Sequence, residues 1–168
     1  MTGRRIVRAL LAGGLLLPTL VAAGCGVRPS GVITGRSAVS GPAQGVGVYL
    51  IGQGELALVL RPAKVAPPLA DVLALLAAGP EENERRQGLT SEVPAGLDPV
   101  TVTSAPDQSD GLTVRTTTTA RALSENAVDQ IVCTVADAAA QTGQTKSFVP
   151  VTIVGPDGAR SPRRCPIG

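Results

Sequence analysis

The chain of 168 residues carries 15 Lys and Arg against 13 Asp and Glu, and it contains no His, no Trp, one Tyr and one Phe. The absence of His excludes Ser-His-Asp and Cys-His nucleophile arrangements and most zinc sites, and the shortage of aromatics argues against a stacking platform for bases or sugars. The sequence also lacks a Gly-rich phosphate loop, a calcium loop and a Ser-x-x-Lys motif. We therefore expect neither an enzyme nor a protein with a metal or a cofactor.

The first 24 residues have the layout of a secretory signal peptide. Three arginines precede an apolar, uncharged core at residues 9–23, which is shorter than the roughly 20 residues that a membrane span needs. Small residues then stand directly before Cys25, and the stretch resembles the bacterial lipobox, with Ala22 where leucine is usual. The resemblance implies a lipid on Cys25 that anchors the chain at the outer face of the cytoplasmic membrane. The alternative is an ordinary cleaved signal followed by a chance cysteine.

Removal of the leader changes the charge balance, because three of the 15 basic residues lie in it. The remaining chain carries 12 Lys and Arg against 13 Asp and Glu, a net charge of −1. Without a concentrated basic face, we expect no nucleic-acid partner. Residues 25–45 are rich in Gly, Ser and Pro and have no apolar period, which predicts a flexible tether in front of one small domain.

Two apolar, β-rich runs follow the tether. They span residues 46–51 and 55–61, and the intervening Gly52-Gln53-Gly54 is typical of a hairpin turn. In the second run leucines alternate with other residues, so that one face carries Leu56, Leu58 and Leu60.

Two helices of different character come next. Apolar residues at helical spacing predict a helix that begins near Pro67-Pro68 and stops at Gly79-Pro80. The run EENERRQ predicts a short polar helix, in which we interpret Glu81, Glu82 and Glu84 as a helix start with surface ion pairs rather than a carboxylate site.

Two more strands are predicted at residues 100–103 and 112–116, before the best-specified helix at 125–142. Ser124 is its expected N-cap, Gly143 ends it, and its apolar stripe consists of Val128, Ile131, Val132, Val135 and Ala139.

A last strand lies in SFVPVTIVG, where Pro150 suggests an edge position. The sequence therefore predicts a single α+β domain. It has one mixed sheet of about five strands in the order ββα(short α)ββαβ, two main helices packed on the sheet, and two right-handed β-α-β crossovers.

Two cysteines remain besides Cys25. Helical geometry places Cys133 about 140° round the helix from Val128, on a flank facing away from the core. Cys165 lies in a polar tail, residues 155–168, that is too rich in Pro and Gly to form core. In an exported protein the simplest interpretation is a disulfide that pins this tail across the helix, and the alternative is two free thiols.

The order of the motifs resembles the GerMN domain of bacterial sporulation and spore-germination lipoproteins. The resemblance covers about residues 46–154 and rests on VYLI with LALVLR, LALLAAGP, GLTSEVPAG and AVDQIVCTV. It implies an α+β domain at the outer face of the cytoplasmic membrane. The implied role is a non-catalytic scaffold or partner-binding module in envelope assembly, sporulation or signalling.

Three functions remain open at this point. The first is binding of another envelope protein, and the second is binding of a small ligand or wall polymer, for which Thr90, Ser91 and Arg115 are the candidates. An enzyme is the third and is disfavoured by the missing His. The most specific motif consists of Gly88, Leu89, Thr90, Ser91 and Pro94. It is either a contact surface or a turn, and its small and hydroxyl residues favour the turn.

Overall fold

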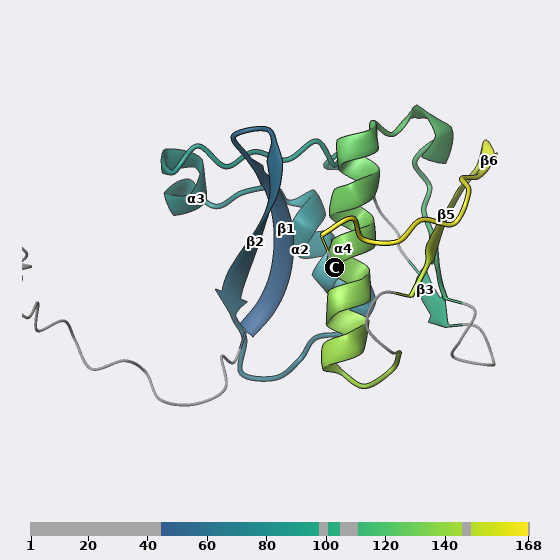
Figure 1. Cartoon of the computed structure of the whole chain (residues 1–168), viewed down its shortest axis with the longest axis horizontal. Helices are drawn as coiled ribbons and strands as arrows, with labels where there is room; N and C mark the ends of the chain where they lie inside the picture. Colours follow the sequence, from purple (N-terminus) through teal and green to yellow (C-terminus); the bar gives the residue numbers. More distant parts are fainter. Residues whose placement is uncertain (1–44, 98–100, 105–110, 146–148, 168) are drawn as a thin grey trace, which may run out of the picture. The chain divides into compact units, whose positions relative to one another are not determined.

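The computed structural model describes residues 45–97, 101–104, 111–145 and 149–167 (Figure 1). The predicted leader, the anchor Cys25 and the tether up to residue 44 lie outside the described residues. In chain order the elements are β1 (Gly45–Gly52), β2 (Glu55–Pro62), α2 (Leu69–Ala77), α3 (Glu82–Arg86), β3 (Thr101–Ser104), β4 (Leu112–Arg115), the 3-10 helix η1 (Ala120–Ala122), α4 (Glu125–Gln141), β5 (Val151–Gly155) and β6 (Gly158–Ala159).

The predicted hairpin is confirmed. β1 and β2 pair antiparallel from Gly52 opposite Glu55 down to Gly45 opposite Pro62. The two turn residues, Gln53 and Gly54, have φ of 54° and 87°. Positive φ at both central positions is the type I′ geometry whose twist matches that of the flanking strands.

The α+β class is confirmed, but the prediction of one sheet is wrong because β1 and β2 form a sheet of their own. The other four strands form a second sheet in the order β3-β4-β5-β6. β4 and β5 are parallel and α4 connects them, whereas the other neighbours are antiparallel. The connection from β2 through α2 to β3 joins different sheets, so it is not the second predicted crossover.

The position predicted for the last strand is also wrong. β5 has a neighbour on each side, and Pro150 lies just before it rather than marking an edge. The missing N–H of Pro150 therefore disturbs no ladder bond, and its carbonyl accepts a hydrogen bond from the Leu112 N–H at 2.9 Å. The short β6, which the sequence did not indicate, supplies the outer neighbour of β5.

The long helix α4 occupies the centre of the molecule and is buried on most of its circumference. Figure 1 shows it between the β1–β2 hairpin and the second sheet, and it contacts β1, α2 and β5. The predicted cap is present, because the Ser124 side chain accepts a hydrogen bond from the Ala127 N–H at 3.1 Å. All five residues of the predicted stripe lie in the core, together with the inner faces of β1, α2, β4 and β5.

Both smaller helices form where the sequence placed them. α2 begins after Pro68 and is followed by Gly79 with φ of 76°, a conformation that suits glycine at a helix end. In α3 the Glu81 and Glu84 side chains form a reciprocal capping box.

Candidate functional site

The outer edge of β1 is closed by side chains of α4. The Tyr49 N–H donates to the Thr134 hydroxyl at 3.0 Å, and the Gln130 amide donates to the Tyr49 carbonyl at 2.9 Å. Both helix residues are fully buried. Two residues further along β1, Ile51 exchanges two backbone hydrogen bonds of 2.8 Å with Thr90. The outward backbone groups of Tyr49 and Ile51, which would otherwise be free at this edge, are therefore satisfied within the molecule.

The predicted motif at residues 88–94 provides part of this closure. Gly88 has φ of 82° and turns the chain after α3, and Thr90 then bridges to β1. Ser91 accepts a hydrogen bond from the Val93 N–H at 3.2 Å and another from the Gln130 amide at 3.4 Å. These contacts give the segment a turn and an edge-pairing role, with Leu89 partly buried against the core and Pro94 exposed.

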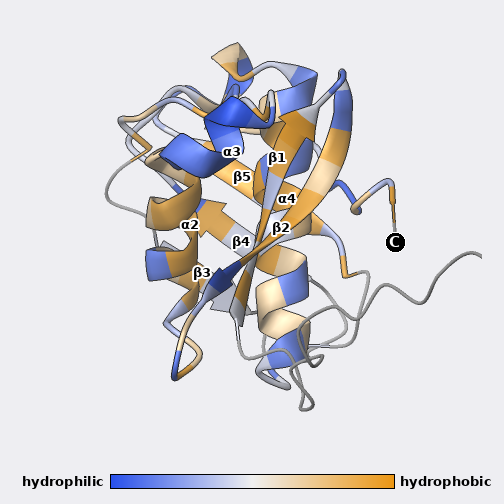
Figure 2. Cartoon of the chain, turned by 90° about the vertical axis from the view of Figure 1, so that its left-hand side faces the viewer, coloured by the Kyte–Doolittle hydropathy of each residue, from blue (hydrophilic) through white to orange (hydrophobic). Residues whose placement is uncertain are grey.

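The outer edge of β2 is different, since no described residue covers it. The backbone N–H and C=O groups of Tyr49 and Ile51 point away from β2. Their opposite residues in β2, Leu58 and Leu56, therefore form non-hydrogen-bonded pairs with them and point their own N–H and C=O groups away from β1. The predicted leucine face exists, but it is turned to solvent: Leu58 is 48% exposed and Leu60 51%. Figure 2 shows β2 at the front of its view as a mostly hydrophobic strand. We define the outer β2 edge as Leu56, Leu58 and Leu60.

A buried ion pair holds the inner face of this strand. The Arg61 guanidinium donates to both carboxylate oxygens of Glu84, at 3.1 and 2.7 Å. It also donates to the carbonyls of Leu75 at 2.9 Å and Gly79 at 2.8 Å, at the C-terminal end of α2. The hydrogen bond from Arg61 lowers the pKa of Glu84 below its ordinary value. Glu84 therefore belongs to the helix start as predicted, but its ion pair is buried, so the prediction of a surface ion pair is wrong for this residue.

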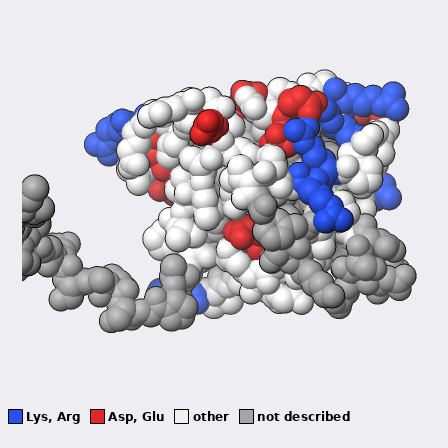
Figure 3. Space-filling model, in the orientation of Figure 1, with Lys and Arg blue, Asp and Glu red and all other residues white. Residues whose placement is uncertain are grey.

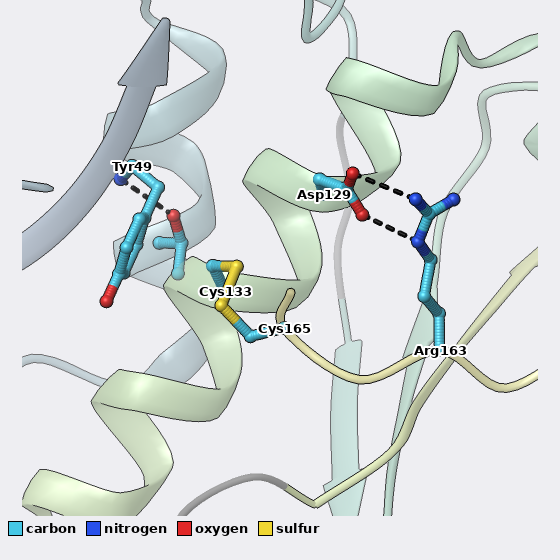
Figure 4. The surroundings of a disulfide bond; sticks show 6 residues. Tyr49, Asp129, Cys133, Arg163 and Cys165 are labelled. Atoms are coloured by element: carbon cyan, nitrogen blue, oxygen red, sulfur yellow. Dashed lines mark hydrogen bonds and ion pairs between the residues drawn. A yellow bond between two sulfur atoms is a disulfide. The ribbon is translucent and has the colours of Figure 1, made fainter. Parts of the chain in front are cut away.

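The structure contains the disulfide between Cys133 and Cys165, with an S–S distance of 2.01 Å and a Cα–Cα distance of 4.7 Å. Cys133 is 1% exposed, because the tail lies over the flank of α4 that carries it. Figure 4 shows the bond next to a second link, in which Arg163 contacts both carboxylate oxygens of Asp129, one helical turn before Cys133. The tail is thus fixed to α4 by a covalent bond and an ion pair.

A pocket of about 410 Å³ lies between this tail and the beginning of α4. Figure 3 shows basic and acidic side chains gathered over this region, at the upper right of the face in view. Arg160 and Arg163 both donate to Glu125, and the hydrogen bond from Arg163 lowers the pKa of that carboxyl group. The lining residues are Arg121, Glu125, Val128, Ala159, Arg160, Ser161, Pro162 and Arg163.

The residues considered for ligand binding are not brought together. Thr90 and Ser91 lie beside β1, whereas Arg115 ends β4 in the other sheet, and none of the three lines this pocket. Within the described ranges no cluster of His, Cys, Asp or Glu could hold a metal ion, and no helix is long and apolar enough to cross a membrane.

Comparison with known proteins gives no assignment. No protein-family model matches the sequence, and neither a curated protein nor a solved structure is similar enough to count as a relative.

Proposed function

We propose that this protein is a lipoprotein anchored through Cys25 at the outer face of the cytoplasmic membrane. The lipobox-like leader supports the anchor, and the Cys133–Cys165 disulfide is consistent with an oxidising compartment outside the cytoplasm. Acylation by two chains would hold the protein stably, whereas one chain would not.

The anchor is tested by Cys25→Ser in the full chain. We expect the variant to appear in the medium or as an unprocessed precursor, whereas Cys133→Ser, which removes a cysteine of the folded domain, stays in the membrane fraction. Normal membrane retention of Cys25→Ser would contradict the lipid anchor.

We further propose that the GerMN-like domain is a non-catalytic protein-binding module of the cell envelope. The observation that carries this proposal is the outer β2 edge, where exposed leucines coincide with unpaired backbone groups. An uncovered apolar edge strand is a template for pairing with another polypeptide.

A photo-crosslinking residue at position 58 in the full chain, expressed in its native membrane, tests this role. We expect one reproducible protein adduct from position 58 and none from the exposed position Gln144, beyond the far end of α4. The proposal fails if both positions give the same products or no protein product.

A second candidate function is the binding of a wall polymer or small anionic ligand, which the arginine-lined pocket favours. Co-sedimentation of the full chain with purified cell walls tests it. Arg121→Gln should weaken binding, and Arg115→Gln, an exposed arginine outside the pocket, should not. Equal binding by both variants and the parent would remove this candidate.

A further inference from the structure

We propose that the partner at the outer β2 edge is a second copy of this chain, whose β2 pairs antiparallel to form a four-stranded sheet across a two-fold axis. The inference rests on the proposed protein-binding role and names its partner. It follows from three features of β2: the direction of its backbone groups, its leucine face and its charge order.

The backbone direction sets which residues can pair. Alternation along the strand gives Leu60 the same orientation as Leu56 and Leu58, so these three residues offer their N–H and C=O groups to a neighbour. No described residue takes these hydrogen bonds. An incoming strand must therefore match its own outward-pointing residues to these leucines, and an antiparallel second β2 does so.

One register matches all three leucines at once. With Leu58 opposite its own copy, Leu56 faces Leu60 of the other copy, and every outward residue is in a hydrogen-bonded pair. The side chains of all three leucines then lie on the same face of the new sheet. Shifting the register by two residues in either direction leaves at least one of the three leucines opposite a residue other than leucine. The strand is thus self-complementary, as a two-fold interface requires.

The charges agree with the same register. β2 begins with the exposed acid Glu55, and the exposed Lys64 follows its end, whereas the charge of Arg61 is already paired with Glu84 inside the molecule. An antiparallel second copy sets the acidic beginning of each strand against the basic end of the other, whereas a parallel copy would set like charges together. Pro62, which has no N–H to donate, stands just outside the paired stretch and ends it.

Cysteine crosslinking in the full chain tests this register. In a hydrogen-bonded antiparallel pair the Cα atoms lie about 5.5 Å apart, within the range that a disulfide spans. We expect Leu58→Cys to form a covalent dimer on mild oxidation in intact cells. Leu56→Cys or Leu60→Cys alone should not, because each lies about 13 Å from its own copy. Co-expression of those two variants should restore the dimer.

The parent chain under the same oxidation controls for its native cysteines. The double variant Leu58→Cys/Leu60→Lys should not form the covalent dimer, because a lysine then faces Leu56 of the other copy. Circular dichroism of the same variant checks that its fold is unchanged. The second-copy inference is overturned if Leu58→Cys gives no dimer, or if all three single variants crosslink equally. If position 58 instead captures a different protein in the photo-crosslinking experiment, the protein-binding role stands and the second copy is rejected.

Discussion

Arg61 joins three elements that follow one another in the chain. Its guanidinium pairs with Glu84 of α3 and with two carbonyls at the end of α2, while its backbone belongs to β2. The cationic group lies at the negative end of the α2 dipole, which adds to the attraction. Both charges are almost completely buried, at 7% and 4% exposure. Removing Glu84 therefore takes away the only buried carboxylate that contacts Arg61 among the described residues.

We predict that Glu84→Ala lowers the free energy of unfolding by about 3–5 kcal/mol, because it leaves the buried Arg61 charge with only the exposed carboxylate of Glu81, at 3.8 Å. The double variant Arg61→Met/Glu84→Leu should lose less than the single variant. Glu82→Ala, in the same helix but in an exposed pair with Arg85, should cost about 1 kcal/mol or less. Urea unfolding of the three variants measures this, and a Glu84→Ala loss no larger than that of Glu82→Ala contradicts it.

The same pair predicts a pH dependence. Because the Arg61 hydrogen bond lowers the pKa of Glu84 below its ordinary value of 4.5, the unfolded chain takes up a proton on acidification before the folded chain does. The stabilisation is complete above pH 4.5 and is lost as the pH falls toward the lowered pKa. We expect Glu84→Gln to show a shallower loss of unfolding free energy below pH 4.5 than the parent. Parallel pH profiles would contradict this assignment.

At the scale of elements, α4 acts as the covering element of a sheet edge as well as a core helix. Gln130 donates to the Tyr49 carbonyl and accepts from the Glu92 N–H at 2.9 Å, so it links β1 to the segment at residues 88–94. Thr134 satisfies the Tyr49 N–H one turn later. The two edges of the hairpin thus differ: the β1 edge is closed by α4, and the β2 edge is open to pairing.

We predict that Gln130→Leu lowers the free energy of unfolding by about 1–3 kcal/mol, since it leaves a buried carbonyl and a backbone N–H without partners. It should also speed hydrogen exchange of the Glu92 amide. Gln144→Leu, the same replacement at an exposed position after α4, should change stability by less than about 0.5 kcal/mol. Equal effects of the two replacements would show that the edge contacts do not contribute.

Elements governed by local rules could be predicted from the sequence, and the partition of the strands into two sheets could not. The hairpin and α4 follow from turn and cap residues within a few positions, such as Gly54 and Ser124. The split into two sheets depends on which distant strands meet, which no local pattern encodes. Gln130 gave no signal as an edge cap, because a polar residue on a helix is normally taken as exposed.

At the scale of the whole molecule, the disulfide connects the C-terminal tail to the central helix, and the tail in turn pairs with β5. Arg163 and Val151 exchange two backbone hydrogen bonds, at 2.7 and 2.9 Å, just before the tail reaches Cys165. A small domain with few aromatic side chains has a small hydrophobic core. A covalent link between α4 and the tail that pairs with β5 therefore contributes strongly to its stability.

We predict that reduction of the Cys133–Cys165 bond costs about 3–4 kcal/mol, because the bond closes a chain segment with a sequence separation of 32 residues in the unfolded state. Urea unfolding with and without reductant measures this loss. The Cys133→Ala/Cys165→Ala variant should have about the same free energy of unfolding as the reduced parent. Reductant should not change that value, since the variant has no disulfide to lose. Thiol titration of the unreduced, denatured parent should detect neither of these two cysteines. A parent whose stability is unchanged by reductant, or whose two thiols both react without it, would contradict a stabilising disulfide.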